Sequence, residues 1–213
     1  MQRSSEAEIL DRPGVPEDLV KRAYRDLTRI HRLLGDTAAI ISALRRDPRP
    51  VHRVLDVGCG RGGVLADIQR ALGVEAVGID LMQASTPGAP FPIVQADAVR
   101  DALPEADVAY SMYLAHHLTE DDLVALIRNI GRFCRRFILL DLVRHPVPLN
   151  LFRLFLAPFV SPIVASDGRV SIRRSYTPAE LEYQVRRALG NSGCRFRHSV
   201  SPLYIRQIVD ISY

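Results

Sequence analysis

Residues 54–63 read VLDVGCGRGG and combine one carboxylate with four glycines. An apolar run leads into this glycine-rich stretch, and a helical pattern follows it to about residue 71. Glycine adopts backbone dihedrals that other residues disfavour, and it lets a ligand approach the main chain. Free amides at the start of a helix favour an anionic or carboxylate group. The segment therefore predicts a ligand-binding bend between a strand and a helix.

The carboxylate of this segment indicates which ligand the bend binds. Gly58, Gly60 and Gly63 also satisfy the GxGxxG spacing of dinucleotide sites, which is a weak indication by itself. Asp56, however, lies inside the strand, two residues before the first glycine. A carboxylate inside the strand, next to the bend, attracts an ammonium group directly or through water. It does not attract a pyrophosphate, which is also negatively charged. The pattern favours S-adenosylmethionine (SAM) over NAD, unless Asp56 only hydrogen-bonds the glycine loop.

Two further acids follow the next predicted strands. Asp80 ends the second strand, where an acid accepts ribose hydroxyls, and Leu81 and Met82 then follow to pack on an adenine. Asp97 and Ala98 follow the third strand, where a carboxylate and an amide can meet the adenine edge. Each assignment has an alternative: Asp80 could be a solvated strand end, Leu81 and Met82 could pack in the core, and Asp97 could form a turn. Together the three acids predict a nucleoside site at the carboxyl edge of a sheet.

The elements that position these residues alternate between strand and helix. Nearly continuous apolarity in the first strand is typical of a strand covered on both faces, and the alternation predicts a parallel sheet. The fold class is α/β, a doubly wound Rossmann-like sheet with a C-terminal antiparallel strand pair and two N-terminal helices. Strands are predicted at residues 52–57, 75–79, 92–95, 107–111, 137–142, 194–200 and 205–211, and helices from residue 17 to Gly35 and at 38–46, 63–71, 120–133 and from 178 after a Thr177 cap.

We expect residues 1–48 to form an arm and two helices that cover the cofactor site. Residues 49–213 then form the SAM-binding domain, in which residues 147–176 are a substrate-side insertion. Residues 147–164 are apolar but contain three prolines and Arg153, which excludes a spanning helix. This segment is expected to shield a pocket or to touch a membrane surface.

Composition argues against several other classes of function. The net charge is +4, but the arginines are scattered along the chain, so we expect no nucleic-acid partner. The three cysteines show no metal-ligand spacing, so no metal site is predicted. An odd number of cysteines and an N-terminus without an apolar signal core indicate a cytoplasmic protein.

VLDVGCGRGG, GIDLM, QADA and SMYLAHHL resemble, as a set, the SAM-binding motifs of class I methyltransferases over residues 50–145. More finely, DLTRIHRLLGD, LLDLVRHP and DGRVSIRRSYTPAEL resemble the ubiquinone/menaquinone-type bacterial methyltransferases associated with type III polyketide synthases. The resemblance implies O-methylation of a phenolic or quinol acceptor, polyketide-like or lipid-tailed, with C-methylation of a quinone precursor as the alternative. One departure is QASTPGAPFPIV between Asp80 and Asp97, whose prolines cannot hold the usual helix. The cofactor residues implied are Asp56, Gly58, Cys59, Gly60, Gly62, Asp80, Leu81, Met82, Asp97, Ala98, Ser111 and Met112.

Histidines after the fourth and fifth strands are the candidates for the transfer step. His117, which matches a histidine of the family, and His145 are the expected general bases, since histidine titrates near neutral pH. The alternatives are a structural role for His117 and a solvated loop position for His145. Candidate acceptor-binding residues are His116, Asp141, Arg173, Arg174 and Tyr176, where the two arginines could instead belong to a solvated basic strand.

The leading interpretation is a small-molecule methyltransferase with an aromatic acceptor. A nucleotide-dependent oxidoreductase is disfavoured by Asp56, by the turn at residues 96–98 and by the terminal strand pair. A SAM-binding protein without catalysis remains the third hypothesis.

Overall fold

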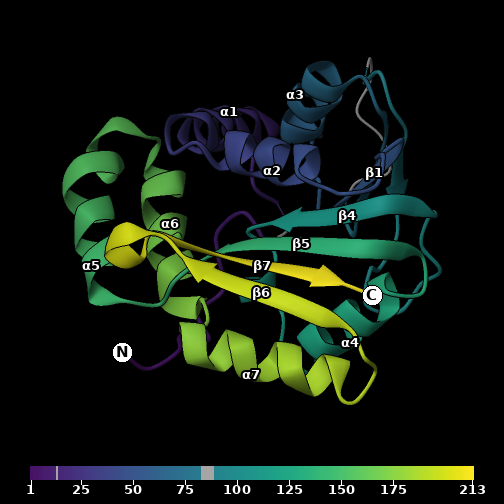
Figure 1. Ribbon diagram of the computed structural model, residues 1–213. Helices are drawn as coiled ribbons and strands as arrows, with labels where there is room; N and C mark the ends of the chain where they lie inside the picture. The colour runs from purple at the N-terminus through teal and green to yellow at the C-terminus, as the bar shows by residue number, and fades with distance from the viewer. Residues whose placement is uncertain (13, 83–88) are drawn as a thin grey trace.

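The computed structural model describes residues 1–12, 14–82 and 89–213, which form a sheet covered by helices on both faces. In Figure 1, α1, α2 and α3 lie above the sheet, while α4 and α7 lie below it. The bounds of these helices are α1 Glu17–Leu33, α2 Asp36–Arg45, α3 Gly63–Leu72, α4 Glu120–Ile130 and α7 Pro178–Leu189.

Within the described residues, seven strands form one sheet in the order β3-β2-β1-β4-β5-β7-β6. The first five in this order are parallel, and β7 runs antiparallel to both β5 and β6. The predicted fold class, with its C-terminal antiparallel pair, is confirmed. The strands are β1 Arg53–Val57, β2 Glu75–Asp80, β3 Ile93–Gln95, β4 Ala106–Met112, β5 Cys134–Leu142, β6 Arg195–Val200 and β7 Arg206–Ser212.

Side chains of β1 alternate between two apolar cores, one on each face of the sheet. Leu55 and Val57 pack with residues of α4 and α7, whereas Val54 packs with residues of α2 and α3. Asp56 shares the face of Val54, because successive strand residues point to opposite faces. The strand therefore holds Asp56 inside the α2–α3 layer, next to the bend that follows.

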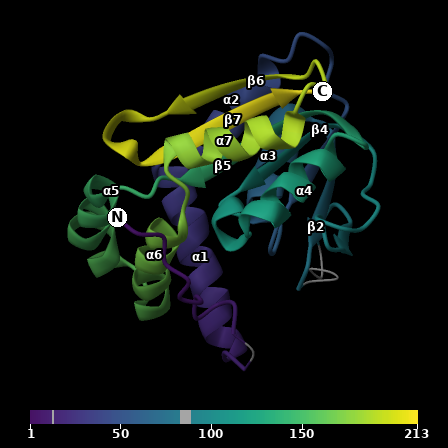
Figure 2. The same ribbon diagram turned by 90° about the horizontal axis from the view of Figure 1, so that it is seen from below.

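The segment between β5 and α7 forms a helical group beside α1, at the end of the sheet (Figures 1 and 2). It consists of α5 Pro146–Leu151, the π-helical turn Phe152–Leu156, the 3-10 turn Ala157–Phe159 and α6 Pro162–Arg174. Arg173 and Arg174 thus end a helix, and the alternative of a basic strand is wrong. Gly168 of α6 has no side chain where the Phe152 ring packs.

The N-terminal arm, residues 1–12, runs along α6 without regular structure over most of its length. Ser4 donates its amide to the Arg173 carbonyl at 3.0 Å, and Asp167 of α6 accepts from the amides of Ile9 and Leu10. The irregular arm is as predicted, and it is anchored by backbone hydrogen bonds. Of the non-helical segment expected after Asp80, residues 83–88 lie outside the described residues.

The helices that the structure describes include none with the length and apolarity needed to cross a bilayer.

Candidate active site

Backbone geometry explains the glycines of the bend after β1. Gly58, Gly60 and Gly62 all have positive φ, at 77°, 53° and 71°, a region that side chains disfavour. A Cβ at Gly60 would lie 2.8 Å from the Tyr24 ring of α1, so α1 packs directly on the bend. The amides of Gly58 and Cys59 donate to the Ile79 carbonyl of β2. The bend is therefore held between α1 and β2, with room for main chain only.

Asp56 is a buried carboxylate beside this bend. It accepts a hydrogen bond of 2.8 Å from the Tyr110 hydroxyl of β4. Burial raises the pKa of Asp56 to about 7; the Tyr110 hydrogen bond opposes this shift, and the charge of Asp80 adds to it. A cation bound nearby would favour the ionised form, so the environment of Asp56 suits an ammonium group.

Asp80 is the last residue of β2 and forms a hydrogen bond with the bend. Its two carboxylate oxygens accept from the amides of Gly60, at 2.8 Å, and Met82, at 2.9 Å. Each carboxylate oxygen has two lone pairs, so acceptor capacity remains for the hydroxyls of a ribose. Leu81 and Met82 are exposed to 61% and 79%, which leaves both free to contact a ligand.

Asp97 forms the turn after β3. Its carboxylate accepts from the Val99 amide at 2.9 Å and pairs with Arg100 at 2.7 Å. Burial opposes ionisation, but these partners outweigh it and lower the pKa of Asp97. These partners are those of a turn-forming aspartate, which was the alternative role for Asp97. A contact with adenine would have to form in addition to them. Asp56, Asp80 and Asp97 nevertheless all lie toward the carboxyl ends of parallel strands, as predicted.

The end of β4 lies against the same bend. A Cβ at Gly58 would lie 3.2 Å from the Leu114 side chain. Ser111 and Met112 are the last residues of β4, and the buried Ser111 hydroxyl has no hydrogen-bond partner among the described residues. Tyr113 follows with φ 59° and donates its hydroxyl to Asp36 of α2 at 2.6 Å. A non-glycine residue at positive φ beside a binding bend marks a strained backbone that its surroundings hold in place.

His116 lies in the 3-10 turn Ala115–His117 and is almost fully buried. Its Nδ1 is 2.7 Å from Asp141 of β5, whose other oxygen accepts from the His116 amide at 2.8 Å. Burial alone would lower the pKa of His116, but the charges and hydrogen bonds of Asp141 and Glu8 raise it to about 9. Two residues that were predicted separately on the acceptor side thus form one buried pair.

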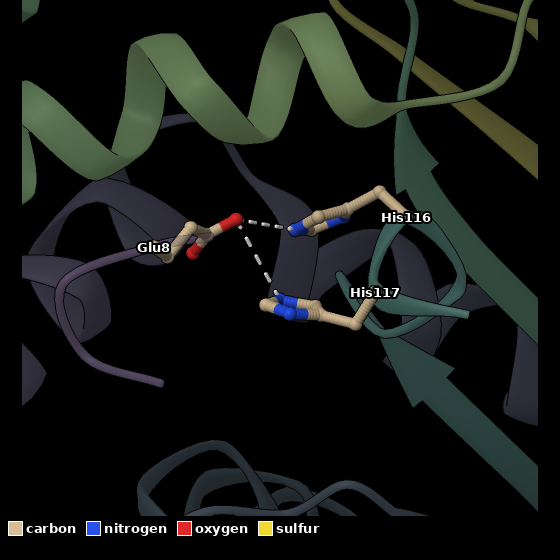
Figure 3. Close-up of side chains that lie close together, drawn as sticks. All are labelled: Glu8, His116 and His117. Carbon is tan, nitrogen blue, oxygen red and sulfur yellow. Dashed lines mark ion pairs between the residues drawn. The ribbon is translucent and has the colours of Figure 1, made fainter. Parts of the chain in front are cut away.

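Glu8 of the arm joins this pair to His117 (Figure 3). Its Oε1 lies 3.4 Å from Nε2 of His116 and 3.8 Å from Nε2 of His117. His117 Nδ1 lies 3.2 Å from Asp11, another arm residue. Sequence reasoning missed Glu8 and Asp11, because nothing in the polar arm indicates which residues it meets in the fold.

The remaining predicted residues have structural partners. His145 caps α5, with Nδ1 accepting from the Val147 amide, and its ring stacks on Tyr204 at 4.3 Å. Tyr176 is buried and donates its hydroxyl to the Leu118 carbonyl, so we withdraw it as an acceptor-binding residue. Arg173 pairs with Glu6 of the arm, and Arg174 with Asp11. The structure therefore gathers His116, His117 and Asp141 into one cluster, while His145 has its own partners in α5 and Tyr204.

Solved structures with the same fold include several methyltransferases. The plantazolicin methyltransferase BpumL in complex with SAH has a TM-score of 0.72 at 14% identity, over 95% of this chain and 92% of that chain. The methyltransferase domain of bacterial CtHen1 has a TM-score of 0.61 at 16% identity, over 84% and 96%. Human N-acetylserotonin methyltransferase in complex with SAM has a TM-score of 0.61 at 15% identity, over 90% and 55%. No curated protein matches the sequence.

The family described as "Methyltransferase domain" matches residues 22–198, which is most of the chain. The match includes the glycine bend, the acids of β1 and β2, and the histidines after β4. SAM is the methyl donor that this family and this fold indicate. The chain belongs to the methyltransferase domain family.

Proposed function

We propose that this methyltransferase transfers the methyl group of SAM to an oxygen of a small phenolic or quinol acceptor. One observation carries the proposal: the bend beside Asp56 and Asp80 lies at the same sheet edge as His116 and His117. Solved structures with this fold support a small or peptidic acceptor, since they include a plantazolicin methyltransferase with a substrate analog, a pyocyanin biosynthetic protein and N-acetylserotonin methyltransferase.

Each part of the cofactor has a matching group in the chain. Backbone amides at the start of α3 suit its carboxylate, Asp56 suits its ammonium group, and Asp80 suits the ribose hydroxyls. Gly60 and Gly62 lack the Cβ atoms that would collide with Tyr24 and Phe91, which explains how the bend packs against its neighbours. The cofactor assignments of the bend rest on the amides and on the two acids, with Cys59 and Ser111 beside them.

Bound SAM supplies a methyl group on a sulfonium, which an acceptor oxygen displaces in line. The residues of this chain then have two tasks, which are to position the acceptor and to accept its proton. We assign the first task to His116, whose pKa of about 9 keeps it protonated near neutral pH, and the second to His117; both follow β4 beside the bend. His117 is the more accessible of the two and is the candidate that receives the hydroxyl proton.

The helical group after β5 supports an acceptor with an apolar part. Leu154, Phe155 and Phe159 expose 67%, 64% and 83% of their surface, which is unusual for large apolar side chains clustered in sequence. Such a surface fits a hydrocarbon tail, and it also fits peripheral contact with a membrane. We propose residues 147–176 as the acceptor-side insertion, and residues 1–48 as the cover of the cofactor, since Tyr24 of α1 packs on the bend.

Calorimetry with SAM and NAD, followed by turnover of phenols and quinols with methyl-labelled SAM, tests this proposal. We expect SAM binding without NAD binding, and a product in which the labelled methyl is on oxygen. NAD binding without SAM binding would overturn the cofactor assignment. A label on ring carbon would establish C-methylation, and SAM binding without turnover of any acceptor would indicate a SAM-binding protein without catalysis.

A further inference from the structure

Two histidines from one turn and a glutamate from the arm converge at the carboxyl edge of the sheet (Figure 3). Glu8 comes from the arm, and His116 and His117 come from the turn after β4. One ligand atom from each lies within 4.8 Å of the other two. We propose that Glu8, His116 and His117 bind a divalent transition-metal ion; the site rests on the proposed function, and with an ion bound His117 would hold the metal while the acceptor hydroxyl would lose its proton to water.

Two of the separations are close to those within a coordination shell. Ligand atoms about 2.0–2.2 Å from a metal ion lie about 3–3.5 Å apart in octahedral or tetrahedral geometry. Glu8 Oε1 lies 3.4 Å from His116 Nε2 and 3.8 Å from His117 Nε2, and all three ligand atoms lie within 4.8 Å of one another. Small movements of the arm and of the histidine rings would bring the three atoms around one ion.

The groups behind the ligands orient them for a metal ion. Asp141 lies 2.7 Å from His116 Nδ1, and Asp11 lies 3.2 Å from His117 Nδ1. A neutral imidazole that donates its Nδ1 proton presents a lone pair at Nε2, which is how carboxylates orient metal-binding histidines. Ser171 donates to Glu8 Oε1 at 2.8 Å and orients the third ligand in the same way.

The buried Nε2 of His116 adds a second observation. His116 is only 3% exposed, and its Nε2 faces Glu8 Oε1 at 3.4 Å without meeting hydrogen-bond geometry. An ion between these two atoms would bond to both of them. In the absence of an ion, a proton on His116 can take the same position between Asp141 and Glu8.

The surrounding charge favours a cation. Glu8, Asp11 and Asp141 bring three carboxylates to the two histidines, and Arg174, 3.9 Å from Glu8 and 3.2 Å from Asp11, is the cation that faces them. Two nitrogens and one carboxylate oxygen suit zinc, cobalt, manganese, iron or nickel better than calcium or magnesium. Water or an acceptor oxygen would fill the remaining positions.

Titration of the chelator-treated full chain with Co²⁺, followed by calorimetry and by the absorption of bound cobalt, tests this site. We expect one Co²⁺ per chain in the wild type, displaced by Zn²⁺. Glu8→Ala and His117→Ala should abolish stoichiometric binding, and Asp11→Ala should weaken it by about tenfold or more. His52→Ala, at an exposed histidine just before β1, is the control and should bind as the wild type does.

The metal site would be overturned if the wild type bound less than one Co²⁺ per chain, or if Glu8→Ala and His117→Ala bound Co²⁺ as well as the wild type does. Thermal unfolding of each variant shows whether it is folded, and His117, which is only partly buried, is the variant least expected to disturb the fold. SAM binding and turnover are measured separately on the same samples. Failure of the metal site with intact SAM turnover, or the reverse, therefore separates the two proposals.

Discussion

Asp80 contributes two charged acceptors to the bend, and its removal tests the nucleoside site directly. Asp80→Ala should weaken SAM binding by more than about tenfold, because two charge-assisted hydrogen bonds of about 1.5–3 kcal/mol each are lost. Loss of the Gly60 and Met82 hydrogen bonds would loosen the bend as well. Calorimetry with SAM measures the effect, with Glu105→Ala, at an exposed carboxylate, as the control. An unchanged affinity would remove Asp80 from the site.

Asp56 should make SAM binding depend on pH. Because burial raises the pKa of Asp56 to about 7, the carboxyl is neutral in mildly acidic solution and attracts an ammonium group less strongly. Affinity for SAM should therefore rise between pH 5.5 and 7.5, by up to about tenfold per unit below the pKa. In Asp56→Asn the affinity should be lower and nearly constant over this range. If the SAM affinity of the wild type were also constant over this pH range, Asp56 would not interact with the cofactor.

The same shift has an opposite consequence for the ligand-free protein. The folded state holds the Asp56 proton up to about pH 7, whereas the unfolded chain releases it near 3.8. The free energy of unfolding should therefore fall as pH rises between these two values, since the folded state binds more protons there. Denaturant unfolding across this range, with Asp56→Asn as the comparison, isolates the contribution of this one carboxyl from that of the other acids.

At the scale of elements, the arm depends on one aspartate of α6. Asp167 accepts from the Ile9 amide at 2.8 Å and from the Leu10 amide at 3.0 Å. Asp167→Ala should raise hydrogen exchange at these two amides by at least about tenfold, because hydrogen bonds to a charged group contribute about 1.5 kcal/mol or more. Ser166→Ala, on the same helix, is the matched control. Unchanged exchange would mean that the arm is held by its other contacts.

The elements also show what local pattern can and cannot predict. The strand ends and the bend were predicted, because the residues that define them are adjacent in sequence. Helix α6 was missed, since Gly168 and the neighbouring prolines reduce helix propensity and the packing of Phe152 on Gly168 is a tertiary contact. Pro162 in fact starts that helix, where a missing N–H costs nothing.

The residues of the candidate site also fall into those that the sequence predicts and those that it does not. Asp56 and Asp80 belong to local motifs, so their positions could be predicted. Glu8 and Asp11, the arm partners of His116 and His117, could not be predicted, because they are far from the histidines in sequence. Burial likewise decided against Tyr176, whose place in the core depends on how α6 and α7 pack rather than on its neighbours in sequence.

At the scale of the whole molecule, one buried carboxylate joins four elements. Asp36 of α2 is fully buried, and its partners are His31 of α1, Tyr113 after β4 and Arg206 of β7. Its side chain therefore links the N-terminal helices both to the centre of the sheet and to its C-terminal strand pair. These partners outweigh burial, which opposes ionisation, and lower the pKa of Asp36.

Asp36→Ala should destabilise the protein by roughly 3 kcal/mol, at the lower end of the range for breaking a buried ion pair, since Arg206 is partly exposed. For a chain of this size, that corresponds to a fall in Tm of about 6–12 °C. Glu75→Ala, which removes an exposed carboxylate at the start of β2, should change Tm far less. In a double-mutant cycle, Arg206→Ala should cost much less in the Asp36→Ala background than in the wild type. Additive effects would mean that the two residues stabilise the fold independently, and that the helices and the strand pair are not joined through Asp36.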